Sequence, residues 1–164
     1  MATVPEGCRK PDPERDWPLY VDHGPSLGAD LHAVWPLTDA AAEVFWDSMV
    51  DAGQPSYRQL PAGHRLSRYT AYGPNWYTYA NDPQLPDAVA AFLRESLPWP
   101  EQQVAFYTHR PRCVYRMSWG VLLRHWRRFM LIDESWVFGL GWPEFALFAD
   151  AGGLAVGDMR PEAE

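Results

Sequence analysis

The chain has 164 residues, of which 47% are hydrophobic and 24 are aromatic, and its formal net charge at pH 7 is −7. This length fits one domain with a buried core, since single domains commonly span roughly 100 to 200 residues. The apolar content excludes a disordered chain. The negative charge argues against general binding to nucleic acid or an anionic membrane, because proteins that follow phosphates usually carry an excess of basic residues.

The first sixteen residues predict a flexible arm, because their prolines and charges offer no periodic apolar positions to bury. They also lack the apolar stretch of a secretory signal, and no run in the chain approaches the roughly 18 apolar residues of a membrane span. We therefore expect a cytoplasmic protein. Cys8 and Cys113 are too few for a disulfide framework or a zinc site, which indicates plain thiols.

Elements in the first half of the chain begin near Trp17. An extended piece is predicted over Leu19–Val21, and Thr38 is placed to cap a helix from Asp39 to about Asp51, with Gly53 at its stop. Between Arg68 and Ala80, strand-forming residues lie on both sides of Gly-Pro-Asn, a pattern that predicts a hairpin.

The second half of the chain predicts two more helices and several strands. One helix opens at Pro86 and ends before Pro98, and Ser118 is placed to cap another over Trp119–Phe129. Strands are expected over Gln103–Thr108, Cys113–Arg116, Ser135–Leu140, Glu144–Ala149 and Leu154–Gly157. The sequence thus predicts a single α+β domain over residues 17–164, with about three helices packed on a largely antiparallel sheet.

Positive charge is concentrated in one stretch, since residues 102–132 contain six arginines, two histidines and no acidic side chain. Without these six charges the remainder of the chain carries −13. Stepping about 100° per residue along Trp119–Phe129 places Trp119, Leu122, Leu123, Trp126 and Phe129 on one side and turns Arg124 and Arg128 the other way. One interpretation is a buried helix with a solvated basic back. The other is a partner-binding patch formed by Arg110, Arg112, Arg124, His125, Arg127 and Arg128.

Other chemical signals are weak. Gly24-Pro25-Ser26-Leu27-Gly28 matches a Gly-x-Ser-x-Gly nucleophile elbow, but the prolines at positions 25 and 36 do not suit its strand-turn-helix context. The pairs Asp22-His23 and Asp30/His32 could supply metal ligands, although their spacing matches no metal motif. The aromatic residues Tyr107, Tyr115 and Trp119 could stack on nucleic-acid bases, but strand aromatics are more often core residues. We expect no cofactor and no metal.

The stretch Trp119-Gly120-Val121 with Trp126 and Phe129, followed by a strand pair and Leu154-Ala155-Val156-Gly157, resembles an uncharacterised bacterial family of small acidic proteins, a domain of unknown function. Trp46 and Leu85-Pro86 occur in similar order, so the likeness spans about Trp17 to Arg160. It implies the fold. No activity is assigned to that family, so the resemblance brings no catalytic residues.

The general character of the chain, small, acidic and rich in aromatics, is also similar to immunity proteins that neutralise bacterial toxins. Tryptophan, tyrosine and arginine dominate binding energy at protein interfaces. We therefore expect a non-enzymatic binding or inhibitory protein whose partner is another protein. The alternative is an enzyme that acts on an anionic small molecule or nucleotide, with arginines holding the charge and His109 or His125 as general acid or base.

Overall fold

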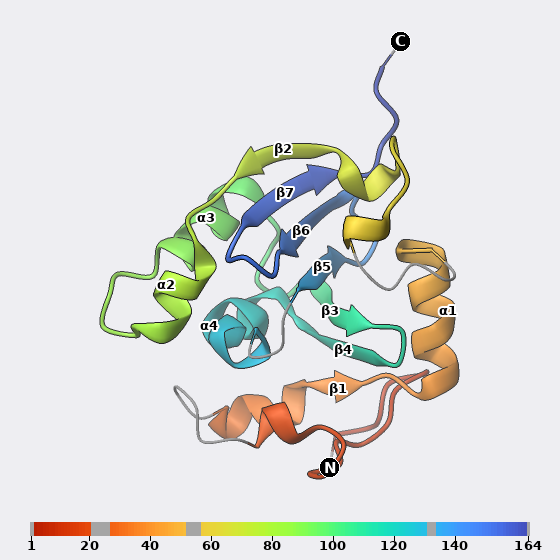
Figure 1. Ribbon diagram of the computed structural model, residues 1–164. Helices are drawn as coiled ribbons and strands as arrows, with labels where there is room; N and C mark the ends of the chain where they lie inside the picture. The colour runs from red at the N-terminus through yellow and green to blue at the C-terminus, as the bar shows by residue number, and fades with distance from the viewer. Residues whose placement is uncertain (1, 21–26, 52–56, 131–133, 164) are drawn as a thin grey trace.

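The computed structural model describes residues 2–20, 27–51, 57–130 and 134–163. Its centre is a sheet with the strand order β1-β4-β3-β5-β6-β7-β2, in which every neighbouring pair is antiparallel (Figure 1). The strands are β1 (Trp35–Pro36), β2 (Tyr69–Tyr72), β3 (Val104–Arg110), β4 (Cys113–Ser118), β5 (Ser135–Gly139), β6 (Glu144–Phe148) and β7 (Leu154–Asp158). The α-helices are α1 (Asp39–Met49), α2 (Trp76–Asn81), α3 (Ala88–Ser96) and α4 (Trp119–Phe129), and short 3-10 helices are η1 (Trp17–Leu19), η2 (Gly28–Ala33), η3 (Tyr57–Gln59) and η4 (Arg65–Ser67). The predicted α+β class and antiparallel sheet are confirmed.

Two of the three longer helices, α1 and α4, begin where the sequence places their caps. Thr38 Oγ1 accepts a hydrogen bond from the backbone N–H of Ala41, and Ser118 Oγ accepts one from Val121, each at 3.3 Å. Such side-chain caps satisfy backbone donors that a helix start leaves unpaired. In α3 the cap is Asp87, so the helix begins two residues after Pro86. The predicted stop of α1 at Gly53 lies outside the described residues.

Both faces of the sheet are packed against helices. Alternation along β3 sends Ala105 and Tyr107 into the core cluster that contains the apolar side of α4. Phe106 points to the opposite face, where its ring centroid lies 4.7 Å from that of Phe45 in α1. In Figure 1, α1 accordingly stands on one side of the sheet, and α2, α3 and α4 stand on the other. The domain therefore has three layers, with α1 alone among the α-helices on its side.

Aromatic pairs fill both cores. On the α1 side, Trp46 meets Trp136 edge to face with ring centroids 5.7 Å apart. On the α4 side, the rings of Trp126 and Phe148 stack at 6.3 Å. Edge-to-face and offset pairs of this kind stabilise a fold beyond the burial of their area. Most of the tryptophans thus serve the core and are not available to a partner.

The predicted hairpin over Arg68–Ala80 is wrong in its second half. Its first part is the strand β2, but β2 pairs with β7 and not with the residues that follow it. Asn75 Oδ1 accepts hydrogen bonds from the backbone N–H groups of Tyr77 and Thr78, at 3.0 and 3.4 Å. The asparagine interpreted as a turn residue is therefore the N-cap of helix α2.

The expectations for the start of the chain also need correction. Residues 17–19 form the 3-10 helix η1, not an extended piece, with Pro18 in its first turn, and Val21 lies outside the described residues. The segment expected to be a flexible arm has backbone pairing with the domain: the N–H of Arg9 donates to the carbonyl of Pro36, and that of Thr38 donates to Gly7, both at 2.9 Å. Residues 7–9 thus run beside the β1 region.

In the part of the chain that the structure describes, no helix has the length and apolar character that crossing a membrane requires.

Candidate functional site

The basic residues of α4 are held by carboxylates from elsewhere in the domain. Asp30 in η2 accepts hydrogen bonds from Arg124 Nε and Nη2, at 3.2 and 3.1 Å, and its Oδ2 lies 2.8 Å from His125 Nε2. The bonds from Arg124, and secondarily the contact with His125, lower the pKa of the Asp30 carboxyl. Asp30, which the sequence suggested as a metal ligand, is thus the internal partner of two predicted patch residues.

His125 is an unusual position in α4. Its backbone angles, φ −122° and ψ 17°, leave the helical region, and two helical segments meet there. Since a carboxylate oxygen only accepts, Nε2 is the ring nitrogen that donates to Asp30. Nδ1 is buried and has no hydrogen-bond partner among the described residues. Among the described residues, the contact of Nε2 with Asp30 is therefore the one hydrogen bond that orients the imidazole ring.

Arg127 is engaged by a second acidic residue. Its Nη1 lies 3.0 Å from Asp87 Oδ2, and its Nε donates to the carbonyl oxygen of Tyr79 at 2.8 Å. The same Asp87 caps α3 and accepts the indole N–H of Trp126 at 3.0 Å. Arg127 also lies 4.8 Å from the centre of the Trp126 ring, a cation–π distance. This arginine joins α4 to α3.

Arg128 is where the predicted orientation is wrong. The helical wheel turned it toward solvent, yet it is only 4% exposed, and it takes part in further interactions within the structure. The reason is that α4 is enclosed on almost all sides, since nine of its eleven residues are buried. A basic back exists only at Arg124, which is half exposed.

The remaining predicted patch residues lie at the turn between β3 and β4. Arg112 is exposed, and its Nε donates to Glu43 Oε1 of α1 at 2.7 Å. Arg110 Nε donates to Nε2 of the buried His109 at 2.8 Å. Burial, reinforced by the Arg110 charge, lowers the pKa of His109 to about 4. The structure thus supplies each predicted binding residue with contacts of its own, and it brings only Arg124 and His125 onto a shared group.

The other chemical signals find little support. Ser26 and the pair Asp22-His23 lie outside the described residues. In the described ranges, no group of three or more histidine, cysteine or acidic side chains could hold a metal ion. Cys8 and Cys113 are free thiols, as predicted, and burial raises the pKa of each.

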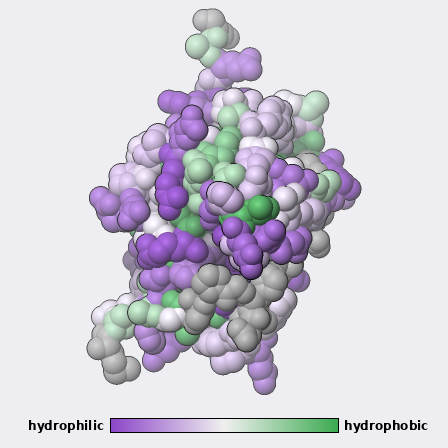
Figure 2. Space-filling view, turned by 90° about the vertical axis from the view of Figure 1, so that its left-hand side faces the viewer, coloured by the Kyte–Doolittle hydropathy of each residue, from purple (hydrophilic) through white to green (hydrophobic). Residues whose placement is uncertain are grey.

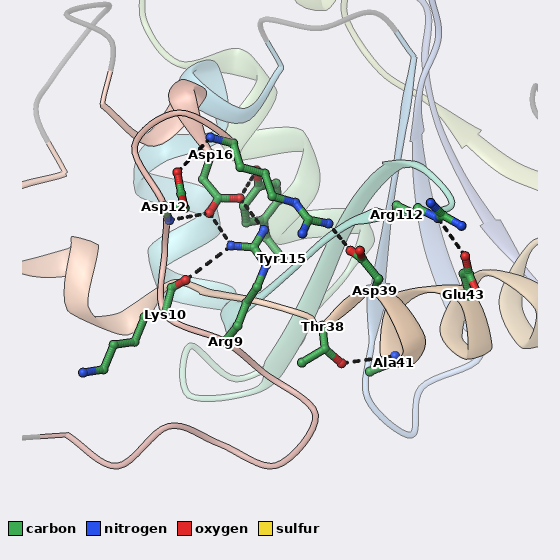
Figure 3. A network of polar contacts seen from close by, with 11 residues as sticks. Arg9, Lys10, Asp12, Asp16, Thr38, Asp39, Ala41, Glu43, Arg112 and Tyr115 are labelled. Atoms are coloured by element: carbon green, nitrogen blue, oxygen red, sulfur yellow. Dashed lines mark hydrogen bonds and ion pairs between the residues drawn. The ribbon is translucent and has the colours of Figure 1, made fainter.

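Sequence reasoning missed a buried ion pair that holds the N-terminal segment (Figure 3). Asp16 is 1% exposed, and its carboxylate receives Arg9 Nη1 and Nη2 at 2.6 and 2.8 Å. The backbone N–H of Asp12 and the hydroxyl of Tyr115 also donate to it, at 2.7 and 3.0 Å. Burial alone would raise the pKa of Asp16, but these hydrogen bonds and the Arg9 charge hold it below the usual range. The segment is part of the domain.

Sequence reasoning also missed an apolar groove beside α1. Two adjoining hollows of about 250 and 500 Å³ share Phe45, Phe106 and Leu140 in their linings. The first extends over Phe138 and Trp142, and the second reaches Glu6 and Arg116. The groove lies where α1 leaves part of its sheet face uncovered. No local signal marks it, because its walls come from the N-terminal segment, α1, β3, β4, β5 and the turn after β5.

The side of the molecule that carries α2 differs from this. Figure 2 shows it as largely hydrophilic, with a narrow apolar strip between polar side chains. Of the exposed large hydrophobic residues in the described ranges, Val44, Leu140 and Trp142 belong to the groove or its rim. The others lie elsewhere: Trp17 and Tyr20 in and after η1, Tyr72 on β2, and Leu85 before α3. The groove therefore gathers more exposed apolar side chains than any of these other places.

Comparison with known proteins identifies the family of this chain but no individual relative. No curated protein and no solved structure matches this chain. The family model described as "Protein of unknown function (DUF2947)" matches residues 13–157, close to the stretch over which the sequence showed its resemblance. The chain belongs to this family.

Proposed function

We propose that this protein is a non-enzymatic binding protein, and that its partner docks in the apolar groove beside α1. The observation that carries the proposal is the exposure of large apolar side chains at a hollow: Val44 is 70% exposed and Leu140 is 56% exposed. Single exposed apolar residues are common, but a contiguous apolar surface with polar surroundings is typical of an interaction site.

The groove offers what a protein interface needs at its centre. The rings of Phe45 and Phe106 contact each other and are half buried. An apolar side chain of a partner that packed on them would therefore remove water both from these rings and from itself. Trp142 stands at one end, its indole N–H held by Gln103 at 2.9 Å. Well-packed aromatic pockets of this kind usually carry most of the binding energy of an interface.

The net charge of the chain favours a basic partner. The chain carries −7 overall, Glu6 lines one end of the groove, and the exposed Asp47 follows the groove residue Val44 on the solvent side of α1. Arg116 is the opposite charge in the lining. We therefore propose a partner that presents an amphipathic segment with apolar side chains toward the groove and basic side chains toward its rim.

Neutralisation of a bacterial toxin, as by an immunity protein, is the specific form of this proposal that the sequence suggested. An acidic inhibitor would be steered toward a basic toxin and could cover its surface without any chemistry of its own. The arginines of α4 contribute less to such a role than the sequence suggested, because Arg127 and Arg128 are engaged within the domain.

The alternative, an enzyme that acts on an anionic small molecule, needs a histidine that faces a cavity. Both His109 and His125 are buried. Neither is among the lining residues of the groove, of the hollow beside Trp35 or of the hollow beside Arg68. His125 does contact a carboxylate, but the contact belongs to the packing of η2 on α4. The apolar groove therefore supports the binding role better than these histidines support catalysis.

The chemistry of the groove can be tested with designed peptides before the partner is known. The probe is an amphipathic helical peptide of about fifteen residues, with leucines along one face and lysines at the other positions. The control peptide has the same leucines and carries glutamates in place of the lysines. Titration followed by amide NMR should show the lysine peptide shifting groove residues, with affinity that falls as salt rises. The glutamate peptide should bind at least about tenfold more weakly.

Two variants make the test specific. Leu140→Glu puts a charge in the groove at an exposed position, so it should abolish peptide binding and leave thermal unfolding nearly unchanged. Leu85→Glu makes the same exchange at an exposed site before α3 and should keep binding intact. Equal binding of both peptides, or binding that survives Leu140→Glu, would contradict the proposal.

The natural partner can be sought through the same position. A photo-crosslinking amino acid placed at Leu140, in the groove, should capture the partner protein. The same amino acid placed at Leu85, in a separate experiment, should not capture it. That protein, once purified, should bind the wild-type chain and fail to bind Leu140→Glu. If it is a toxin, cells that make the wild-type chain should survive it, and cells that make Leu140→Glu should not.

A further inference from the structure

A second hollow lies between the N-terminal segment and the η1–β1 region. Its volume is about 570 Å³, within the range of small-molecule sites. Most of its lining is apolar or aromatic, supplied by Pro11, Tyr20, Leu31, Val34 and Trp35. Trp35 and Leu31 are half buried, and Val34 belongs to the core, so this wall is continuous with the packed domain. Such a surface favours a flat or aliphatic body.

Two nitrogen-bearing side chains lie in the same lining. Lys10 and His32 both contribute to it, and no acidic residue is found among the lining residues that are described. Lys10 is the one lysine in the chain, and Figure 3 shows its side chain pointing away from the Asp16 network. Neither side chain has a hydrogen bond or ion pair with another residue that the structure describes. Both can donate to an oxygen anion.

The wall that carries Lys10 is held in place by the buried ion pair. Arg9 on one side of Lys10 bonds to Asp16, and the backbone of Asp12 on the other side bonds to the same carboxylate at 2.7 Å. The carbonyl of Lys10 itself accepts a hydrogen bond from Arg9 Nη1 at 3.3 Å. Because these contacts fix the backbone on both sides of Lys10 and Pro11, this side of the hollow is formed before any ligand arrives.

We propose that this hollow is a binding site for a small carboxylate with an aromatic or aliphatic body. The body lies against Trp35, Leu31 and Tyr20, and the carboxylate meets the Lys10 ammonium and the His32 imidazole. Apolar walls with a few convergent polar groups are the usual design of such sites, in which the polar groups fix orientation and specificity. The site is separate from the groove beside α1 and does not depend on the protein-binding role.

Naphthalene-2-carboxylate is a suitable probe, and naphthalene-2-carboxamide is its neutral match of nearly the same shape. Calorimetry on the full chain should show that the carboxylate binds and that the amide binds about tenfold more weakly. Amide NMR should place the shifted signals at Lys10 and at residues 31–35. Equal affinities, or shifts confined to other parts of the molecule, would overturn the proposal.

Variants separate this site from the groove and from a folding defect. Lys10 and His32 are exposed, so the double variant Lys10→Gln/His32→Gln should fold with an unchanged unfolding temperature and bind carboxylate and amide equally. A double variant that still prefers the carboxylate would refute the assignment. Leu140→Glu in the groove should bind naphthalene-2-carboxylate like the wild type, whatever it does to peptide binding. Loss of carboxylate binding in this variant would place the ligand in the groove instead.

Discussion

The hydroxyl of Tyr115 donates to the Asp16 carboxylate at 3.0 Å, although the two residues are 99 positions apart in the chain. Tyr115 belongs to β4, next to the edge strand of the sheet, and Asp16 ends the segment that precedes η1. This contact and the Arg9 pair attach the N-terminal segment to the sheet. Burial, with the nearby Cys113 and Asp16 adding to it, raises the pKa of Tyr115, so the phenol keeps the proton that it donates.

Asp16→Asn is expected to destabilise the domain by about 3 kcal/mol at neutral pH. The exchange keeps the size of the side chain but removes the charge that pairs with Arg9, and breaking a largely buried pair leaves the other charge uncompensated. Urea unfolding followed by tryptophan fluorescence measures the difference. The control is Asp39→Asn, which breaks the exposed pair with Arg15 and should change stability little. Equal losses in the two variants would mean that burial of Asp16 adds nothing.

Acid should weaken the wild-type domain partly through the same carboxylate. Its folded pKa lies below its ordinary value of 3.8, so its contribution is complete above that pH and disappears as the pH falls through the folded pKa. Asp16→Asn has no such proton to bind and should lose less stability below pH 3.8. Stability curves of the two proteins that stay parallel in this range would contradict the expectation.

The sequence predicted best the elements that short-range contacts specify. Thr38 and Ser118 cap their helices within three residues, and the apolar spacing of α4 lies within the helix itself. The second half of the predicted hairpin failed because Asn75 serves equally well in a turn or at a helix start, and its bonds to Tyr77 and Thr78 decide between them.

The site could not be predicted in the same way because its partners are distant in the chain. A helical wheel turns Arg128 away from the apolar side of α4, but it cannot show that the rest of the domain encloses that side as well. Asp30 lies 94 positions before Arg124, and nothing local marks it as the partner. The groove is harder still to predict from the sequence. Val44 and Leu140 are exposed because no other part of the described domain covers them, and no local pattern shows this.

His109 should make stability depend on pH in a higher range. Its pKa falls from 6.5 to about 4 in the folded domain, chiefly through burial and also through Arg110. Between these values the unfolded chain binds a proton that the folded domain does not, so stability is complete above pH 6.5 and declines toward pH 4. The full loss is on the order of 3 kcal/mol.

His109→Gln provides the comparison for this titration. Glutamine can still accept the hydrogen bond from Arg110 but binds no proton in this range. The variant should therefore show a flatter stability curve between pH 6.5 and 4 than the wild type, measured by urea unfolding at each pH. The same slope in both proteins would show that folding does not lower the pKa of His109.

Gly157 in β7 is expected to tolerate no side chain. A Cβ placed there would lie 2.4 Å from Phe145 Cζ and 2.5 Å from the carbonyl oxygen of Arg68, far inside normal contact. Gly157→Ala should cost about 2 kcal/mol, because the backbone at Arg68, just before β2, would have to move. In Gly153→Ala the nearest atom is Ala149 Cβ at 3.5 Å, an ordinary contact, so its thermal unfolding should differ little from that of the wild type.

The replacement of Arg124, His125 and Arg128 together by alanine tests what the basic side of α4 does. If these residues formed an exposed patch, partner binding would weaken and thermal unfolding would stay nearly unchanged. The structure leads us to expect the reverse: two of the three side chains are buried, and Asp30 would lose both of its partners in α4. The triple variant should lose more than about 3 kcal/mol of stability.

Arg124→Ala alone separates the one exposed residue from the buried ones. Arg124 is half exposed and its pair with Asp30 is open to water, so the single change should alter stability by less than about 1 kcal/mol. Partner binding is then the informative measurement, because it no longer depends on folding. Weaker binding of the photo-crosslinked partner by Arg124→Ala would extend the interface to α4. Unchanged binding, together with loss of binding in Leu140→Glu, would confine it to the groove beside α1.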